Sequence, residues 1–432
     1  MINPAQSPSL SRRRFLGNTA ALTPLFFPYV LKGATGANAK NQDTLKIGLV
    51  GCGGRGTGAA SQALNADYNI KLYAVADALV EKAEATVKML GDKFANRVEV
   101  PKERQFTGMD AYKKVIESCD VVILATPPGF RPMHMQAAVE AGKHMFCEKP
   151  MAVDAAGYRV ALDAIRKAKE KRLSVVAGFC WRRSASRKEA MQRLHDGKIG
   201  DVASILSTYH TGPVKPMPEA SARKPEWSDV EWQIRNWYNF SWLGGDGLVE
   251  QAVHSVDKLC WAMNDANPIA CVATGGRQIP SNGGNIYDHF HVAYEFPNNV
   301  ICHLASRQIT GCYNENADVI RGAKGALIIG KGNAPFMDAE DRWRFKGEEK
   351  DMYQVEHDEF FASIRKGEPL NDGDWMLHST MVGIMGRMSA YTGKKLTWEE
   401  AIKSEEDLAP EETLKWGDKF EPTSLPRPGQ KA

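Results

Sequence analysis

The sequence has little net charge, no paired cysteine motif and no long hydrophobic run, and each absence excludes a class of function. Its 432 residues carry 55 Lys and Arg against 52 Asp and Glu, a formal net charge of +3. So small an excess gives no electrostatic basis for binding a nucleic acid or a membrane surface. The eight cysteines are scattered without a C-x-x-C pair, so neither a zinc site nor a redox motif is indicated. Internal repeats and low-complexity tracts are also missing.

The chain is long enough for more than one domain. Its composition, 43% hydrophobic and 25% charged, is ordinary for a globular protein, and domains commonly run to roughly 100–200 residues. Motifs and composition divide it into a targeting segment over residues 1–39, a first domain over 40–178 and a second domain over 179–432.

The first 39 residues have the pattern of an export signal. Residues 11–16 are S-R-R-R-F-L, an apolar stretch covers residues 20–31, and A-N-A at residues 37–39 fits a cleavage site. These parts make a signal peptide, and consecutive arginines before Phe-Leu indicate the twin-arginine type. The alternatives are an ordinary secretory signal or a retained anchor. However, two prolines break the apolar stretch, and a spanning helix needs about 20 apolar residues.

Export by the twin-arginine machinery has consequences for the mature protein. We therefore expect a periplasmic or otherwise exported protein. Because this route carries proteins that have already folded in the cytoplasm, its cysteines should be mainly free, although its destination is oxidising. A dinucleotide enzyme outside the cytoplasm has no obvious supply of free cofactor. Any NAD or NADP would therefore travel tightly bound and stay bound.

A glycine-rich turn, K-I-G-L-V-G-C-G-G-R-G, opens the first domain at residues 46–56. An apolar strand pattern stops at this turn, and its spacing fits the G-x-G-x-x-G dinucleotide fingerprint. The first glycine permits a tight turn, the second lets the backbone approach a pyrophosphate, and the third lets helix pack on strand. The helix N-terminus then offers free N–H groups to the phosphates. Alone the fingerprint is weak, because glycine turns also serve structure only. The candidate cofactor residues here are Gly51, Gly53, Gly54, Arg55 and Gly56.

An acidic residue ends the next predicted strand, residues 70–77. Asp77 lies 26 residues after Gly51, near the roughly 20-residue offset of the carboxylate that binds the ribose. A carboxylate there repels a 2′-phosphate, so NAD is favoured over NADP, although Arg55 could accept that phosphate. The alternative is a turn residue at a strand end without a ligand role.

A third buried strand, residues 120–125, ends at Thr126 and Pro127. Ligands of parallel sheets bind beyond the carboxyl ends of the strands. We therefore assign both residues to cofactor binding, together with His134 on the following helix.

Residues 141–150 read A-G-K-H-M-F-C-E-K-P. With the glycine turn and the T-P after an apolar strand, this segment resembles the glucose–fructose oxidoreductase/inositol dehydrogenase family (Gfo/Idh/MocA). The resemblance implies that Lys149 is catalytic, because in that family the lysine reaches both the nicotinamide edge and the substrate hydroxyl. It also places Glu148 in the cofactor site. A surface lysine is the alternative, but a lysine beside a cofactor crevice is well placed for a pKa lowered by burial. Pro150 in such a motif can be cis.

Residues 174–179 form a further strand that completes the doubly wound sheet. Family members touch the nicotinamide half of the cofactor with the segment that follows. On this loose match, the resemblance assigns Trp181 and Arg182 to cofactor binding.

A stretch rich in proline and tryptophan occupies residues 212–242, with tryptophans at 227, 232, 237 and 242. One interpretation is a packed insertion that uses tryptophan as its core. The other is an aromatic wall for a sugar ring, whose C–H faces stack on indole. The second interpretation makes Trp237 a candidate substrate contact.

Charged side chains and an imidazole recur at helical spacing after G-G-D-G. From Val249 the apolar residues repeat at steps of four and three, which predicts one face of a helix. Glu250, His254 and Asp257 follow the same steps on a stripe about 100° away. In isolation this spacing would indicate a structural pair, in which the histidine and the glutamate satisfy each other's hydrogen bonds on a helix. Family members carry D-x-x-x-H here, which implies that His254 is catalytic and that Glu250 orients it or binds substrate, with Asp257 as a further substrate contact. Glu250 replaces the usual aspartate, and Ala252 stands where glycine is common.

Residues 288–296 and 300–309 alternate like antiparallel strands joined by a turn. His289 and His291 share one side of the first strand, but no third ligand is evident, so we expect no metal. Family members bind substrate on one face of such an open sheet and often associate through the other, which implies a homo-oligomer.

Together these patterns predict an α/β fold. An N-terminal Rossmann domain with a doubly wound parallel sheet precedes a C-terminal α+β domain with an open, mainly antiparallel sheet. The predicted function is an NAD(P)-dependent oxidoreductase that transfers a hydride between tightly bound cofactor and a carbinol carbon of a sugar, sugar derivative or cyclitol. A neutral base serves best, and we assign it to His254 with Lys149 sharing the hydroxyl. The reverse assignment stays open. The alternatives are a redox-neutral, NAD-dependent glycoside-cleaving enzyme and a non-catalytic sugar-binding module that retains NAD.

Overall fold

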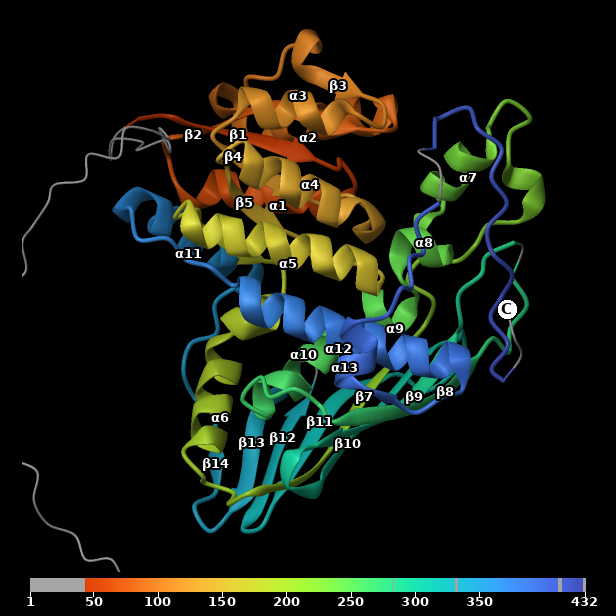
Figure 1. The fold of residues 1–432 in the computed structure, drawn as a ribbon. Helices are drawn as coiled ribbons and strands as arrows, with labels where there is room; N and C mark the ends of the chain where they lie inside the picture. Colours follow the sequence, from red (N-terminus) through yellow and green to blue (C-terminus); the bar gives the residue numbers. More distant parts are fainter. Residues whose placement is uncertain (1–42, 282, 331–332, 411–413, 430–432) are drawn as a thin grey trace, which may run out of the picture. The chain divides into compact units, whose positions relative to one another are not determined.

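The computed structural model describes residues 43–281, 283–330, 333–410 and 414–429. The predicted export signal over residues 1–39 lies outside these ranges. The described chain forms two sheets, one of six strands and one of nine. Figure 1 shows the six-stranded sheet with its helices in the upper part of the view and the nine-stranded sheet in the lower part.

The six-stranded sheet is parallel throughout, in the order β3-β2-β1-β4-β5-β6. Its central strand β4 is apolar and buried along its whole length, and β1 is buried except at Lys46, because helices cover both faces of the sheet. The strands are β1 (Leu45–Val50), β2 (Ile70–Asp77), β3 (Gln105–Thr107), β4 (Val121–Leu124), β5 (His144–Cys147) and β6 (Val175–Ala177). The predicted doubly wound sheet is confirmed.

Helices cover both faces of this sheet. On one face lie α1 (Gly54–Ala66) and α2 (Val80–Phe94). On the other lie α3 (Ala111–Ser118), α4 (Arg131–Glu140) and α5 (Ala155–Glu170).

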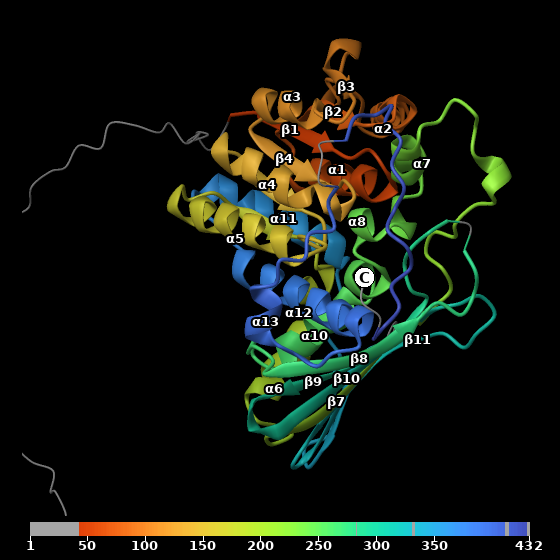
Figure 2. The same ribbon diagram turned by 45° about the vertical axis from the view of Figure 1, so that its right-hand side comes forward.

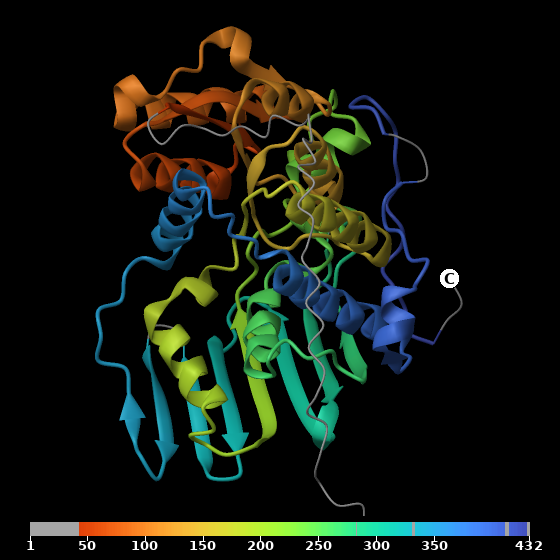
Figure 3. The same cartoon turned by 60° about the vertical axis from the view of Figure 1, so that its left-hand side comes forward.

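One helix from the later half of the chain returns to the first sheet. It is α11 (Met352–Lys366), whose Phe360, Phe361 and Ile364 join the core formed by β1, α1 and α2. Figure 3 shows this light-blue helix beside the red-orange helices of the first sheet. Its local sequence does not indicate the sheet on which it packs.

The second sheet has the order β14-β13-β12-β11-β7-β10-β9-β8-β15. Among the strands that the structure describes in this sheet, β7 and β10 alone pair in parallel, and the other pairs are antiparallel. This mixed, mostly antiparallel sheet agrees with the prediction. Its strands are β7 (Val202–Thr211), β8 (Ala270–Gly276), β9 (His289–Phe296), β10 (Val300–Gln308), β11 (Glu315–Gly322), β12 (Gly325–Gly330), β13 (Asn333–Ala339), β14 (Trp343–Arg344) and β15 (Leu396–Thr397).

Helices pack on one face of the second sheet, as the alternation of buried and open positions along β9 and β10 requires. They are α6 (Ala185–His195), α10 (Val253–Ala262), α12 (Gly373–Thr392) and α13 (Trp398–Ile402). Figure 2 shows the opposite face free of helices in the described part of the chain. The long helix α12 is buried on nearly all sides and ends at Gly393, whose φ of +71° suits a glycine stop.

The prediction of one continuous helix from Val249 onward is wrong, because the structure has two helices there. The structure has α9 (Gly247–Glu250) and α10, with Gln251 and Ala252 between them. The apolar period continues across the break, since Val249, Val253 and Val256 are all buried. Periodicity therefore could not reveal it.

The tryptophan-rich insert, residues 212–242, and the C-terminal segment form a small core of their own. It contains α7 (Asp229–Arg235), α8 (Ser241–Gly244) and the one-turn helix Trp237–Asn239, with Trp416 and Phe420 packed against them. Figures 1 and 2 both show the blue C-terminal segment running alongside the green α7. Residues 423, 426 and 429, in the last part of the chain that the structure describes, are hydrogen-bonded to the rest of the fold.

Two further findings concern the chain as a whole. No helix among the described residues is long and apolar enough to cross a membrane. All eight cysteines lie in the described ranges and are unpaired, and seven of them are buried.

Candidate active site

The glycine turn has the geometry that a dinucleotide requires. Gly51 has φ +98°, and a Cβ there would lie 2.6 Å from backbone atoms of Ala125 and Thr126. A Cβ on Gly56 would lie 1.9 Å from the Gly51 carbonyl oxygen, so helix and turn touch. At Gly53 a Cβ would meet nothing within 4 Å. The first and third glycines are therefore needed by the fold, whereas the second leaves open space in which a phosphate can approach the N-terminus of α1.

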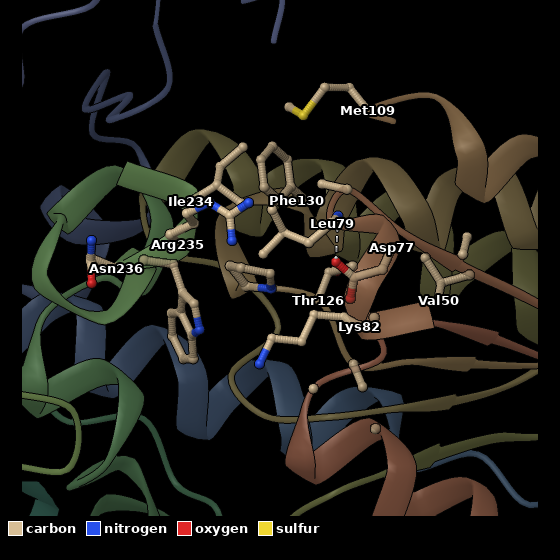
Figure 4. A pocket seen from close by; sticks show the side chains of 18 of the residues that line it. Val50, Asp77, Leu79, Lys82, Met109, Thr126, Phe130, Ile234, Arg235 and Asn236 are labelled. Carbon is tan, nitrogen blue, oxygen red and sulfur yellow. Dashed lines mark hydrogen bonds between the residues drawn. The ribbon is translucent and has the colours of Figure 1, made fainter. Parts of the chain in front are cut away.

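A cavity of about 610 Å³ lies in front of this turn. Figure 4 shows side chains pointing into it from two sides, with Asp77 and Lys82 on one side and Arg235 and Asn236 on the other. Nine of the predicted cofactor residues line it: Gly51, Gly53, Gly54, Arg55, Gly56, Asp77, Thr126, Pro127 and His134.

Asp77 is fixed at the edge of the cavity by the backbone around it. One carboxylate oxygen accepts from the Cys52 N–H at 2.7 Å and the other from the Leu79 N–H at 2.9 Å, the bond drawn in Figure 4. Burial raises the pKa of the Asp77 carboxyl. Each oxygen keeps a further lone pair, so the oriented carboxylate can still accept from a ribose hydroxyl.

Glu148 connects the E-K-P segment to the glycine turn. Its carboxylate pairs with the Arg55 guanidinium, Nε to Oε1, at 2.6 Å. The pairing needs a glycine behind it, because a Cβ on Gly178 would lie 2.6 Å from the Glu148 carboxylate. Tyr353 of α11 lies under the same guanidinium, 4.8 Å from ring centroid to Cζ. Glu148 thus positions a residue of the cavity wall without lining the cavity itself.

Thr126 and His134 form a polar pair on the cavity wall, with Thr126 Oγ1 and His134 Nδ1 3.1 Å apart. Burial, assisted by Arg131, lowers the pKa of His134 to about 3. The imidazole is therefore neutral, and Tyr112 packs against it with ring centroids 4.2 Å apart.

Lys149 and Glu250 meet from the two halves of the chain. Lys149 Nζ lies 2.8 Å from Glu250 Oε1 and also donates to the Glu250 carbonyl oxygen. The other Glu250 oxygen accepts from Gln251 Nε2 at 2.7 Å. The Lys149–Pro150 peptide is cis, as the motif suggested. The ammonium and the carboxylate are each about nine-tenths buried, so this is an enclosed ion pair.

His254, one turn further along, lies in an aromatic niche. Trp181 stacks on its ring at 6.0 Å between centroids, and Phe179 meets it edge-on at 6.2 Å. Burial, and then the charges of Lys149 and Lys258, hold the pKa of His254 well below its usual value. The ring is therefore neutral. Among the described residues its Nδ1 has no hydrogen-bond partner.

Arg182 and Asp257 bind each other and lie outside the lining of the cavity. Arg182 Nε donates to Asp257 Oδ1 at 2.9 Å, and the same oxygen accepts from Ser379 at 2.8 Å. The two carboxylate oxygens of Asp265 accept hydrogen bonds from Arg182 Nη2 at 2.6 Å and from Nη1 at 3.0 Å. Asp257 therefore faces a different set of partners from Glu250 and His254, although all three were predicted on one stripe.

Trp237 does line the cavity, on the side of the insert. Trp242 and Trp232 belong to the small core, where Trp242 Nε1 donates to Gln233 at 2.8 Å. The packed-core interpretation is thus confirmed for part of the stretch, and Trp237 as a sugar contact stays a prediction. The wall that contains Trp237 faces the glycine turn and Asp77.

Some residues of the site were missed by sequence reasoning. Near Glu250 they form two polar pairs: Tyr209 donates to Gln251 at 2.9 Å, and Tyr238 and Gln308 bond to each other at 2.6 and 2.9 Å. They come from strands and an insert far apart in sequence, so no spacing could join them. Along the cavity the missed residues include Leu79, Lys82, Met109, Phe130, Lys215, Ile234, Arg235 and Asn236.

Comparison with known proteins agrees with this geometry. Residues 45–177 match an oxidoreductase family with an NAD-binding Rossmann fold, GFO/IDH/MocA, and residues 188–328 match the GFO/IDH/MocA C-terminal domain. The inositol 2-dehydrogenase of Rhizobium meliloti (strain 1021) is 25% identical over 351 residues, which are 76% of this chain and 93% of that protein. A levoglucosan dehydrogenase of Pseudarthrobacter phenanthrenivorans is 33% identical over 240 residues, 50% of this chain and 57% of that protein.

A solved structure shares the fold. A levoglucosan dehydrogenase in complex with NADH and levoglucosan matches with a TM-score of 0.63 at 18% identity, covering 82% of this chain and 99% of that chain. The glycine turn, the cavity before it and these matches to both halves of the chain lead to one conclusion. The chain belongs to the Gfo/Idh/MocA family of NAD(P)-dependent oxidoreductases.

Proposed function

We propose that this protein interconverts an alcohol and a carbonyl on a sugar, sugar derivative or cyclitol, in the region around Lys149, Glu250 and His254. The observation that carries the proposal is the enclosed Lys149–Glu250 pair, with a 2.8 Å contact, close to a neutral imidazole. His254 follows Glu250 by four residues, and burial, helped by the charge of Lys149, lowers the pKa of its ring. The relatives named for inositol and levoglucosan support a polyhydroxylated substrate.

The three side chains divide the proton chemistry between them. A bound nicotinamide supplies the hydride acceptor or donor. His254 is neutral, so one ring nitrogen is free to accept the hydroxyl proton as the alcohol is oxidised. Lys149, paired with Glu250, acts as a hydrogen-bond donor that holds the substrate oxygen. We therefore assign the base to His254 rather than to Lys149.

Glu250 acts on Lys149 rather than on His254. Its carboxylate contacts the ammonium directly, and Gln251 fixes its other oxygen. The polar pairs that contain Tyr209, Tyr238 and Gln308 offer further donors and acceptors for substrate hydroxyls.

For the cofactor we propose NAD in preference to NADP, held tightly. The Asp77 carboxylate at the ribose end of the cavity disfavours a 2′-phosphate. Tight binding follows from the proposed export by the twin-arginine pathway, since the exported protein would meet little free cofactor. We also propose a homo-oligomer formed through the open face of the second sheet.

The test uses the mature protein. Acid release should yield about one NAD per chain, and adding candidate sugars and cyclitols should reduce the bound nucleotide, seen by the absorbance of the reduced nicotinamide. Lys149→Ala should abolish reduction but keep the nucleotide, with Lys143→Ala as the matched control. Bound NAD that no polyol reduces would favour a binding module. Glycoside cleavage without net reduction would favour the redox-neutral alternative.

A further inference from the structure

The cavity before the glycine turn has a second wall that does not belong to the Rossmann domain. Residues of the insert form this wall, opposite Asp77, Leu79 and Lys82. Figure 4 shows Ile234 and Arg235 on the green insert facing these residues across the cavity. The insert residues that line it are Lys215, Pro218, Ala222, Trp227, Trp232, Ile234, Arg235, Asn236 and Trp237.

The position of the second wall identifies the part of the ligand it would cover. Asp77 stands at the end of β2, where a dinucleotide places the ribose of its adenosine half. Trp227 and Trp237 are half-buried and line the cavity. Arg235 and Trp232 pack against the Trp227 ring, so Trp237 is the aromatic side chain best placed to meet a ligand. Aromatic faces suit a purine base, and the ammonium groups of Lys82 and Lys215 suit phosphate oxygens.

The insert is attached to the Rossmann domain across the cavity. Arg235 of α7 pairs with Glu81 of α2 at 2.6 Å. Phe130 packs edge-on against Trp242, with ring centroids 5.9 Å apart. Both contacts join the two walls and hold the insert against the Rossmann domain across the cavity.

The end of the chain holds the insert in place. Phe420 donates its N–H to Asp229 at 3.1 Å, and its carbonyl oxygen accepts from Gln233 at 2.6 Å. Its ring meets Trp242 edge-on at 5.6 Å. Ser228 donates to the Trp416 carbonyl oxygen. The segment over residues 414–429, called the strap below, therefore supports α7 from the side away from the cavity.

We infer that the insert and the strap form a lid that covers the adenosine half of the dinucleotide and slows its release. The inference rests on the proposed function, in which this cavity holds NAD(P). It adds cofactor contacts outside the Rossmann domain, namely Trp237 and Arg235, and it names the segment that supports them.

The test compares two glutamates on the same helix. The full mature chain is loaded with NADH, and its dissociation rate is followed by fluorescence after mixing with excess NAD. Glu81→Gln removes the pair that joins α2 to the lid. Glu84→Gln makes the same change in an exposed pair with Lys102, within the Rossmann domain. An exposed ion pair is worth up to about 1 kcal/mol, so we expect release up to about fivefold faster in E81Q and unchanged in E84Q.

A second variant acts on the strap. Phe420→Ala removes the ring that contacts Trp242, and we expect release to be about tenfold faster or more with the thermal transition of the protein still cooperative. Hydrogen exchange in the insert should slow when NADH is added to the wild-type protein and slow less in F420A. The lid is overturned if the wild-type protein binds NADH while E81Q and F420A, both folded, release it at the wild-type rate. A wild-type protein that binds no dinucleotide would instead refute the proposed function itself.

Discussion

At the scale of single residues, Asp77 shows how the backbone prepares a side chain for a ligand. Two N–H groups, from Cys52 and Leu79, orient its carboxylate at the cavity edge. The nearby ammonium of Lys82 and that of Lys215 are the charges that a 2′-phosphate would meet if the carboxylate were absent. The proposed preference for NAD over NADP therefore rests on one negative charge among cations.

Asp77→Asn tests this dependence. The amide keeps the size of the side chain but removes the charge, and hydrogen bonds to charged groups are worth about 1.5–3 kcal/mol. We expect the Kd for NAD to rise about tenfold and the preference for NAD over NADP to shrink by more. Titration of NAD and of NADP into the protein after its nucleotide has been removed measures both Kd values and the preference between them. Asp110→Asn, on the exposed surface near α3, should change neither value, and an unchanged NAD preference in D77N would remove the assigned role.

A second single residue, His357, makes the stability of the protein depend on pH. It is fully buried between Phe146 and Phe361, and burial lowers its pKa to about 3. An unfolded histidine titrates near 6.5. As the pH falls below about 6.5, this histidine binds a proton in the unfolded chain but not in the folded chain. The free energy of unfolding therefore decreases as the pH is lowered.

His357→Phe should remove this contribution. As the pH is lowered from 6 to 5, we expect the wild type to lose about 1 kcal/mol more unfolding free energy than the variant. Above pH 7 the difference between the two proteins should change little. Urea unfolding at pH 5, 6 and 7 provides the comparison. If wild type and variant lose stability in parallel on acidification, the histidine does not resist protonation in the folded state.

At the scale of elements, the turn between β1 and α1 separates structural from ligand-binding glycines. Gly53→Ala places its methyl group in open space at an extended φ of −76°, whereas Gly56→Ala drives it to 1.9 Å from the Gly51 carbonyl oxygen. The two changes are chemically identical but meet different surroundings.

We expect opposite results from this pair. G56A should lose about 1–3 kcal/mol of stability or more through overpacking. G53A should keep its thermal stability but bind NAD at least about tenfold more weakly, because its methyl occupies the approach of the pyrophosphate. Thermal unfolding and nucleotide titration of both variants are the measurements, and a G53A protein with unchanged NAD affinity would contradict the cradle.

Elements also show how far sequence alone could go. The β1–α1 turn and β2 were predictable because a dozen adjacent residues determine them. The break between α9 and α10 was not, since the apolar period runs through Val249, Val253 and Val256 without interruption. Asp257 fell on the same stripe as Glu250, yet Arg182 and Ser379 turn it elsewhere. Those partners come from other segments, and only tertiary packing brings them together.

At the scale of the molecule, the same limit explains α11 and the lid. Phe360 and Phe361 of α11 are buried, but nothing in the local sequence indicates that this helix returns to the first sheet. The tryptophan-rich insert lay well outside the Rossmann segment in sequence, so its place across the cavity from Asp77 could not be foreseen. Contacts between distant segments were the part of the site that needed the structure.

Export is a whole-molecule property that can be tested directly. If the twin-arginine pathway carries this protein, replacing Arg12 and Arg13 with Lys should leave it in the cytoplasm with its signal attached. Fractionation and mass determination of the N-terminus would show this. A Lys-Lys variant that is still exported and cleaved would indicate an ordinary secretory signal. The nucleotide content of the exported wild-type protein reports at the same time whether the cofactor travels with it.

The strap also sets an order of assembly. The glycine turn is at residue 51, whereas Trp416 and Phe420, which support the opposite wall of the cavity, are translated long after it. In a nascent chain the proposed lid therefore lacks its support until residue 420 has been made. Nucleotide can reach the turn before that point, and the strap then holds the proposed lid over it.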